Sequence, residues 1–374
     1  MAVESRDIAF DLKTIERDRI IAKAQRYLPE EPLTVTGEQC ERSEGGPHDY
    51  YSEGDYWWPN PEDPKGPYIR RDGETNPDLF YAHRYAMVRL SEIVGTFASA
   101  YFLTADASYA ARGIAHLRAW FADPETRMNT NLLYGQAIKG LHSGRSIGII
   151  DTLHLTEVAL GAKLLSGSRA MDADTDSGIR NWFRSYLDWI QTHPYGQTER
   201  VHPNNHGVCW SMQAAAFAHL LGDEDVLKWV RNQFRSVYLD EMMDDRGAFP
   251  AELARTKPYG YSLFVIDAMA GVAQIASTPD DDLWEFGLED GRGMLKGVEF
   301  IAPYIADKYA WPFGEDILYW DDWPVRHPSL LLGALRFGRS DWLASWSNLE
   351  PDPMPFEVQR NLPLRHPLIW SWSA

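Results

Sequence analysis

The sequence predicts an all-α fold, a closed (α/α) toroid of helical hairpins whose long loops line a cleft. From about Tyr81 onward, apolar residues recur at spacings of three and four, the pattern of amphipathic helices. Helix-capping residues precede such runs, as in Gly222-Asp223-Glu224-Asp225. Strand-like alternation is weak, and no strict repeat of about 34 to 47 residues is visible, which disfavours an open solenoid.

The chain has 374 residues, and 44% of them are hydrophobic, enough for a sizeable core. We predict a single domain over residues 1–374. An N-terminal helix falls within residues 1–29. An aromatic segment without periodicity follows at 30–78, and the helical pattern fills the rest.

Segment 30–78 is rich in Pro, Gly and aromatic residues, among them Tyr56, Trp57 and Trp58. An aperiodic segment of this length is more often functional than a linker, and flexible linkers are not built from tryptophan. We expect it to lie on the rim of the cleft. Its aromatic rings are then candidates for stacking on sugars, although tryptophan also serves as core filler.

The net charge of −18 excludes some partner classes. It disfavours nucleic acids and anionic membranes. The sequence contains no stretch of 18 apolar residues that would indicate a membrane span. An acidic polysaccharide remains possible if cations gather around the cleft, because exposed charges are screened within about 10 Å. Cys40 and Cys209 make no metal spacing, and two thiols are favoured over one long-range disulfide.

The first candidate motif is His202-Pro203-Asn204-Asn205-His206-Gly207. The following run, 208–217, reads as a helix, so Asn204 or Asn205 caps it and His206 lies in its first turn. A helix start attracts carboxylates through its N–H groups and partial positive charge. An Asn amide there can donate to a carboxylate beside His206. By itself the pattern is more often an ordinary helix cap, with the histidine bonded to the backbone.

The second motif, about fifty residues later, contains Arg255, Tyr259 and Tyr261. The run from Ser262 reads as a helix, which places Tyr261 near its start. A tyrosine base at neutral pH needs its pKa lowered by about three units, or roughly 4 kcal/mol. One cation about 4 Å away at an effective dielectric near 20 contributes about that much. Arg255 is one candidate cation, and a protonated His206 is another. Tyr259 is a competing phenol and a candidate for substrate contact.

Together these groups suit β-elimination on a uronic acid. The C5 proton lies beside a carboxylate, whose charge must be offset as the enolate-like state develops. A base then removes the proton, and an acid protonates the leaving O4. The reaction needs no metal and no cofactor. Weaker candidates for substrate contact lie in a glycine-bearing segment: Gln136, His142 and Arg145.

These motifs resemble the alginate lyase superfamily. The resemblance is carried by Asn204-Asn205-His206-Gly207 with Arg255 and Tyr261, and by Tyr51–Pro61 and Gly144–Gly148, which look like polysaccharide lyase family 38, a relative of family 5. It implies an incomplete α/α toroid that cleaves a 1,4-linked uronan, alginate or glucuronan. Asn205, His206 and Arg255 would surround the carboxylate, and Tyr261 would transfer protons. Asn204, next to Asn205, would contact substrate or take its place.

Two other functions fit the same composition. A glycoside hydrolase would need two carboxyl groups across the cleft. The loop candidates are Glu53, Asp55, Glu252, Glu315, Asp316, Asp321 and Asp322. A non-catalytic protein that binds acidic polysaccharides would keep the aromatic residues alone. We expect a monomer or weak homo-oligomer in the periplasm or outside the cell, although the first residues show no apolar signal core.

Overall fold

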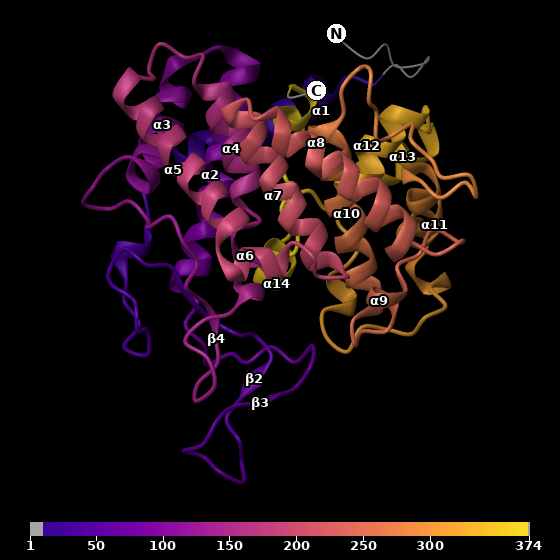
Figure 1. Ribbon diagram of the computed structural model, residues 1–374. Coiled ribbons are helices and arrows are strands. Elements are labelled where there is room, and N and C mark those ends of the chain that lie inside the picture. The colour runs from indigo at the N-terminus through magenta and orange to yellow at the C-terminus, as the bar shows by residue number, and fades with distance from the viewer. Residues whose placement is uncertain (1–9, 373–374) are drawn as a thin grey trace. The chain divides into compact units, whose positions relative to one another are not determined.

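The computed structural model describes residues 10–372, which fall into two compact units (Figure 1). Within the described part, unit 1 comprises 10–12, 202–215 and 223–372, and unit 2 comprises 13–201 and 216–222. Helix α7 (Asn205–Leu221) contributes its first part to unit 1 and its last turns to unit 2. Helices dominate both units, as predicted. The single domain over 1–374 stays a prediction.

Unit 2 is built mainly on five longer helices. The predicted N-terminal helix is α1, and the part of that prediction that covers residues 1–9 lies outside the described residues. The helices and 3₁₀ turns are α1 (Leu12–Tyr27), η1 (Val35–Gly37), α2 (Ala82–Thr104), α3 (Ala107–Phe121), η2 (Ser146–Thr152), α4 (Leu155–Leu165), α5 (Ala173–Thr192) and α6 (Pro194–Glu199).

Local sequence signals set where these helices begin. Asp106 accepts a hydrogen bond from Ser108 N (2.8 Å), and Asp172 accepts one from Thr175 N (2.8 Å), so both act as N-caps. Helix α2 then packs against α3 and α4. A Cβ at Gly161 would lie 2.8 Å from Val94 Cγ1, so the glycine lets α4 approach α2 closely.

Segment 30–78 carries most of the short strands of unit 2. Strand β1 (Tyr51–Glu53) pairs in parallel with β4 (Tyr134–Ala137), and β2 (Trp57–Trp58) pairs antiparallel with β3 (Ile69–Arg70). These strands span two to four residues. That is too short for an alternating pattern to reveal, so the sequence indicated only loops here.

Unit 1 is a second helical assembly, coloured from rose to yellow in Figure 1. Besides the start of α7, its elements are α8 (Glu224–Gln233), the π-helix η3 (Phe234–Met242), α9 (Pro250–Leu253), α10 (Pro258–Ala276), α11 (Met294–Ala306), η4 (Lys308–Ala310), η5 (Trp320–Asp322), α12 (Pro328–Phe337), α13 (Ser340–Ser347), α14 (Phe356–Arg360) and α15 (Pro367–Trp372). Helices α6 and α9 are too short for a helical period to show in the sequence.

Helix α10 is the centre of unit 1. It packs against α8, α9, α11 and α12. It is long and apolar enough to cross a membrane, yet 89% of its most apolar window is buried inside the protein, as in a core helix. The helix that carries Tyr261 is therefore held on several sides, and only its first turn is partly exposed.

A buried polar cluster fastens α10 to α12. Asp267 accepts hydrogen bonds from His327 Nδ1 (2.7 Å), Ser329 N (3.1 Å) and Ser329 Oγ (2.6 Å). His327 Nε2 accepts from Val325 N (3.3 Å), which assigns the donor role to Nδ1. All the polar atoms of Asp267 are satisfied, as buried carboxylates require.

Replacing this carboxylate is expected to weaken unit 1. Asp267→Asn keeps the volume but turns one acceptor oxygen into a donor that faces His327 Nδ1–H. We expect the free energy of unfolding to fall by about 2 kcal/mol, measured by urea denaturation followed by circular dichroism. An unchanged denaturation midpoint would show that the cluster does not contribute to stability.

Candidate functional site

The start of α7 presents the Asn-Asn-His motif at the edge of unit 1. Asn204 is the cap, because its Oδ1 accepts a hydrogen bond from His206 N (3.0 Å). Asn204 and His206 are half-buried, and Asn205 is only 1% exposed. The His202 ring lies 5.1 Å from the His206 ring, centroid to centroid.

A protein carboxylate already occupies this helix start. Glu252 Oε1 accepts a hydrogen bond from Asn205 N (2.7 Å), and Glu252 Oε2 accepts one from Asn205 Nδ2 (2.8 Å). Burial raises the pKa of Glu252, while the bonds from Asn205 and the charges of Arg255 and His206 act in the opposite direction. The expectation that these backbone N–H groups bind a ligand carboxylate is therefore wrong, because Glu252 and Asn204 accept from the first two.

Three residues beyond Glu252, Arg255 meets Tyr261. Arg255 Nη2 donates a hydrogen bond to the Tyr261 hydroxyl (3.1 Å), and the guanidinium lies 4.2 Å from the centroid of the same ring. Tyr261 stands in the first turn of α10, and both side chains are half-buried. The sequence-predicted pair is thus brought together. A guanidinium that donates to a phenol oxygen favours the ionised phenolate.

Asp316 holds the start of α10 as Glu252 holds the start of α7. Its Oδ1 and Oδ2 accept hydrogen bonds from Tyr259 N (2.8 Å) and Gly260 N (2.9 Å). Burial raises the pKa of Asp316 despite these two bonds. Each carboxylate thereby supplies the acceptors that the first N–H groups of a helix lack.

Tyr259 is not the substrate contact that the sequence suggested. Its side chain is 0% exposed, and its hydroxyl donates to the Tyr304 carbonyl (2.9 Å). Burial also raises its pKa, which opposes service as a base near neutral pH. One of two nearby phenols faces inward and the other outward because the helix turns by about 100° per residue.

A small pocket adjoins Tyr261. Its walls include Lys257, Tyr319, Trp323 and Asn361. Lys257 Nζ donates to Glu357 (2.6 Å), and Arg360 donates to the other Glu357 oxygen (2.6 Å). Burial alone would raise the pKa of Glu357, but Arg360 and Lys257 lower it to about 2. Lys257 is therefore held by an internal anion rather than presented as an open cation.

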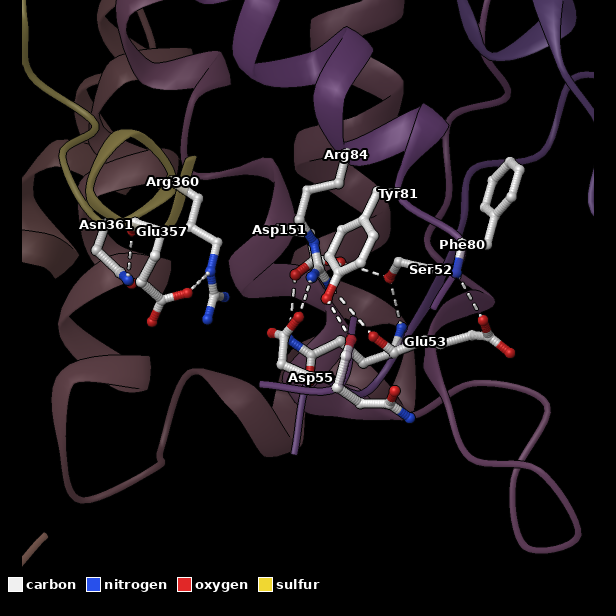
Figure 2. A network of polar contacts seen from close by, with 12 residues as sticks. Ser52, Glu53, Asp55, Phe80, Tyr81, Arg84, Asp151, Glu357, Arg360 and Asn361 are labelled. Atoms are coloured by element: carbon white, nitrogen blue, oxygen red, sulfur yellow. Dashed lines mark hydrogen bonds and ion pairs between the residues drawn. The ribbon is translucent and has the colours of Figure 1, made fainter. Parts of the chain in front are cut away.

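Unit 2 has a separate polar cluster around Asp151 (Figure 2). Arg84 pairs with both Asp55 and Asp151, and Ser52 donates to the same Asp151 oxygen. Gln136 Nε2 donates to the other Asp151 oxygen (3.1 Å). Side chains from β1, α2 and β4 thus converge on one buried carboxylate, which η2 carries.

The structure corrects the predicted role of Gln136. Its Oε1 accepts from Arg145 Nη2 (3.1 Å) while its Nε2 is bound to Asp151, and the residue is only 7% exposed. Gln136 also has a φ of 49°, which is uncommon for a residue other than glycine. It positions Arg145 instead of reaching a ligand.

Arg145 remains a candidate for substrate contact. Its Nε donates to the Gln136 carbonyl (2.8 Å), and its guanidinium lies 5.8 Å from the Trp57 ring centroid. Burial lowers its pKa to about 10, so it stays a cation at neutral pH. A Cβ at Gly54 would lie 2.8 Å from Arg145 Nη2, so this glycine makes room for the guanidinium.

The other predicted contacts of unit 2 lie at partly open positions. Tyr56, Trp57 and Trp58 are half-buried, and His142 is exposed. Trp58 Nε1 donates to the Glu74 carbonyl (2.9 Å), which fixes its ring. That these residues line a cleft with His206 stays a prediction. Cys40 and Cys209, both in the described part of the chain, are thiols.

Sequence reasoning missed the supporting carboxylates. Glu252 and Asp316 were considered only as hydrolase acids, and Glu357 was not considered. Glu252 lies 47 residues from Asn205, and Asp316 lies 57 residues from Tyr259. No local spacing joins partners so far apart. The sequence showed only that acidic residues such as Glu252 and Asp316 stand outside the periodic helical runs.

The alginate lyase family model matches residues 34–311 of this chain. The chain belongs to the alginate lyase family. It is 31% identical to an alginate lyase from Bacteroides ovatus, with a TM-score of 0.82 over 96% of this chain and 93% of that one. Family membership makes it a polysaccharide lyase, and it confirms the predicted all-α class with the α/α toroid fold.

More distant structures share the fold. Alginate lyase A1-III from Sphingomonas species A1 is 14% identical, with a TM-score of 0.58 over 94% of this chain and 93% of that one. A histidine-to-alanine variant of A1-III, complexed with a tetrasaccharide, is also 14% identical, with a TM-score of 0.60 over 98% and 97%. Among curated proteins, none is detectably related to the chain.

The burial of Tyr259 gives a prediction that separates it from Tyr261. Tyr259→Phe removes only the hydroxyl that donates to Tyr304, which should cost about 1 kcal/mol of stability. The rate of uronan cleavage should stay within about twofold of the unmodified enzyme, because no atom of this side chain reaches solvent. A loss of turnover in a variant that remains folded would show that Tyr259 takes part in the reaction.

Proposed function

We propose that this protein cleaves 1,4-linked uronan chains, alginate first among them, by β-elimination at the start of α10. The observation that carries this proposal is the hydrogen bond from Arg255 to the Tyr261 hydroxyl. It places a guanidinium directly against a phenol that can move a proton. The alginate lyases that this chain resembles support the substrate class.

The groups divide the chemistry between them. His206, Arg255 and an asparagine amide offset the uronate carboxylate as negative charge spreads from C5. Tyr261 protonates the departing O4, and it also removes the C5 proton when H5 and O4 share a face. H5 and O4 share a face in mannuronan. In guluronan, whose C5 has the opposite configuration, they lie on opposite faces, and His206 is then the base.

Four of the seven candidate acids of the hydrolase alternative are held in internal contacts. Glu252 and Asp316 cap helices, Glu53 is held by Arg42 in two hydrogen bonds (2.7 and 2.6 Å), and Asp55 is paired with Arg84. A glycosidase needs one carboxyl to give a proton and another to act as base or nucleophile. Acids held as acceptors do not suit either role.

The reaction type is tested by the product. Polymannuronate, polyguluronate, glucuronan and hyaluronan are supplied in turn, and ultraviolet absorbance of the unsaturated uronate is followed. We expect absorbance to rise with at least one of the two alginate blocks. Shortened chains without this absorbance would show hydrolysis, and no change in any polymer would leave only a binding protein.

Tyr261→Phe tests the phenol directly. The variant keeps the ring against Arg255 but has no proton to give, so kcat should fall by about 10²–10⁴-fold with little change in the affinity for uronan. Cleavage rates are read by absorbance, and affinity by calorimetry. Near-normal turnover would contradict the assignment of Tyr261.

The two asparagines differ in what they can offer. Asn205 Nδ2 gives one N–H to Glu252. Asn204 uses its Oδ1 on His206 N, and its Nδ2 donates no hydrogen bond within residues 10–372. Asn204→Asp keeps the cap but places a negative charge toward the uronate. We expect kcat/KM to fall by about 100-fold or more.

Asn204→Ser is the matched control, because a hydroxyl can both cap the helix and donate. It should retain most of the activity. Equal activity of Asn204→Asp and the unmodified enzyme would instead point to the second N–H of Asn205 as the donor.

A further inference from the structure

We propose that Glu252 is a positioning residue, which holds the Asn205–His206 helix start and Arg255 in one arrangement without touching the substrate. This inference rests on the proposed function and adds to it the group that organises the site. Glu252 is 0% exposed, so a sugar does not reach it. Its effect must therefore pass through the residues that it contacts.

The geometry assigns each carboxylate oxygen a partner on the same residue. Oε1 accepts from the Asn205 backbone (2.7 Å), and Oε2 accepts from its side-chain amide (2.8 Å). Two bonds to one residue fix both the helix start and the rotation of the Asn205 side chain. Such charge-assisted bonds are stronger than those between neutral groups.

The same carboxylate ties α7 to the segment that carries Arg255. Glu252 is in α9, and Arg255 follows three residues later, with Arg255 N donating to the Glu252 carbonyl (3.1 Å). The charges of Arg255 and His206 both act on the Glu252 carboxyl. Glu252 therefore interacts with both Arg255 and His206, two of the residues proposed to meet the uronate.

A neutral group of the same shape cannot do this. Glutamine offers one acceptor and one donor where the carboxylate offers two acceptors. Its Nε2 would then face Asn205 Nδ2, so the Asn205 amide must turn over or move away. Glu252→Gln is expected to lower kcat about 10- to 100-fold, as small misplacements of reacting groups do, while KM changes by less than about threefold.

Lowering the pH should have the same effect on the unmodified enzyme, because it protonates Glu252. Because burial raises the pKa of Glu252 against the opposing effects of Asn205, Arg255 and His206, protonation begins above the usual carboxyl range. A protonated Glu252 has a donor in place of one acceptor, so kcat should fall as pH decreases through this pKa. On mannuronan, where Tyr261 both removes and donates the proton, that acidic decrease in kcat should be absent from Glu252→Gln.

The decisive experiment is an NMR titration of the full-length protein from about pH 8 to about pH 4. The ¹³Cδ signal of Glu252 and the side-chain amide signal of Asn205 are followed together, each assigned by its loss in Glu252→Gln or Asn205→Ala. We expect one shared midpoint, which also matches the acidic limb of kcat. An Asn205 amide that does not respond when Glu252 titrates would overturn the proposal.

Asp267→Asn is the matched control, since it also neutralises a buried carboxylate of unit 1 that accepts at a helix start. It should lower stability and leave the acidic limb in place. A folded Glu252→Gln enzyme with normal kcat and an unchanged pH profile would contradict the positioning role. If no uronan is cleaved, the proposed function fails. The shared NMR midpoint of Glu252 and Asn205 still tests the positioning role of Glu252.

Discussion

Two buried carboxylates hold the candidate site together. Glu252 accepts the first N–H of α7, and Asp316 accepts two N–H groups in the first turn of α10. Helix starts leave N–H groups without partners, and burying them unpaired is costly. Each acid comes from a distant segment, so satisfying the helix also fixes that segment against it. His206 and Tyr261 lie in these two first turns, and their positions depend on the caps.

The same interactions explain how an acidic protein keeps cations near a polyanion. Lys257 is neutralised by Glu357, and Arg70 pairs with Asp72 (2.6 Å). Arg255 instead donates to a phenol, and Arg145 donates to a glutamine. The neutral amide oxygen of Gln136 orients the Arg145 guanidinium without cancelling its charge. Local partners therefore matter more here than the net charge of −18.

Helical periodicity and capping residues were enough to predict the class of the fold, and the Asn-His and Arg…Tyr motifs identified the pair at α10 and the turn at α7. The sequence did not predict the contacts between residues that lie far apart in the chain. Tyr259 and Tyr261 differ in burial only because of how α10 packs. The Gln136 side chain is bound to Asp151, a residue on another element. The strands of segment 30–78 are too short for any period to show.

The most direct test of this account is a crystal structure of Tyr261→Phe with a bound uronate tetrasaccharide. We expect one sugar carboxylate within hydrogen-bonding distance of His206 and Arg255, with C5 and O4 of adjoining sugars facing residue 261 and Glu252 beneath Asn205, away from the sugar. A tetrasaccharide whose carboxylates all lie away from His206 and Arg255, or that contacts Glu252 itself, would contradict the account.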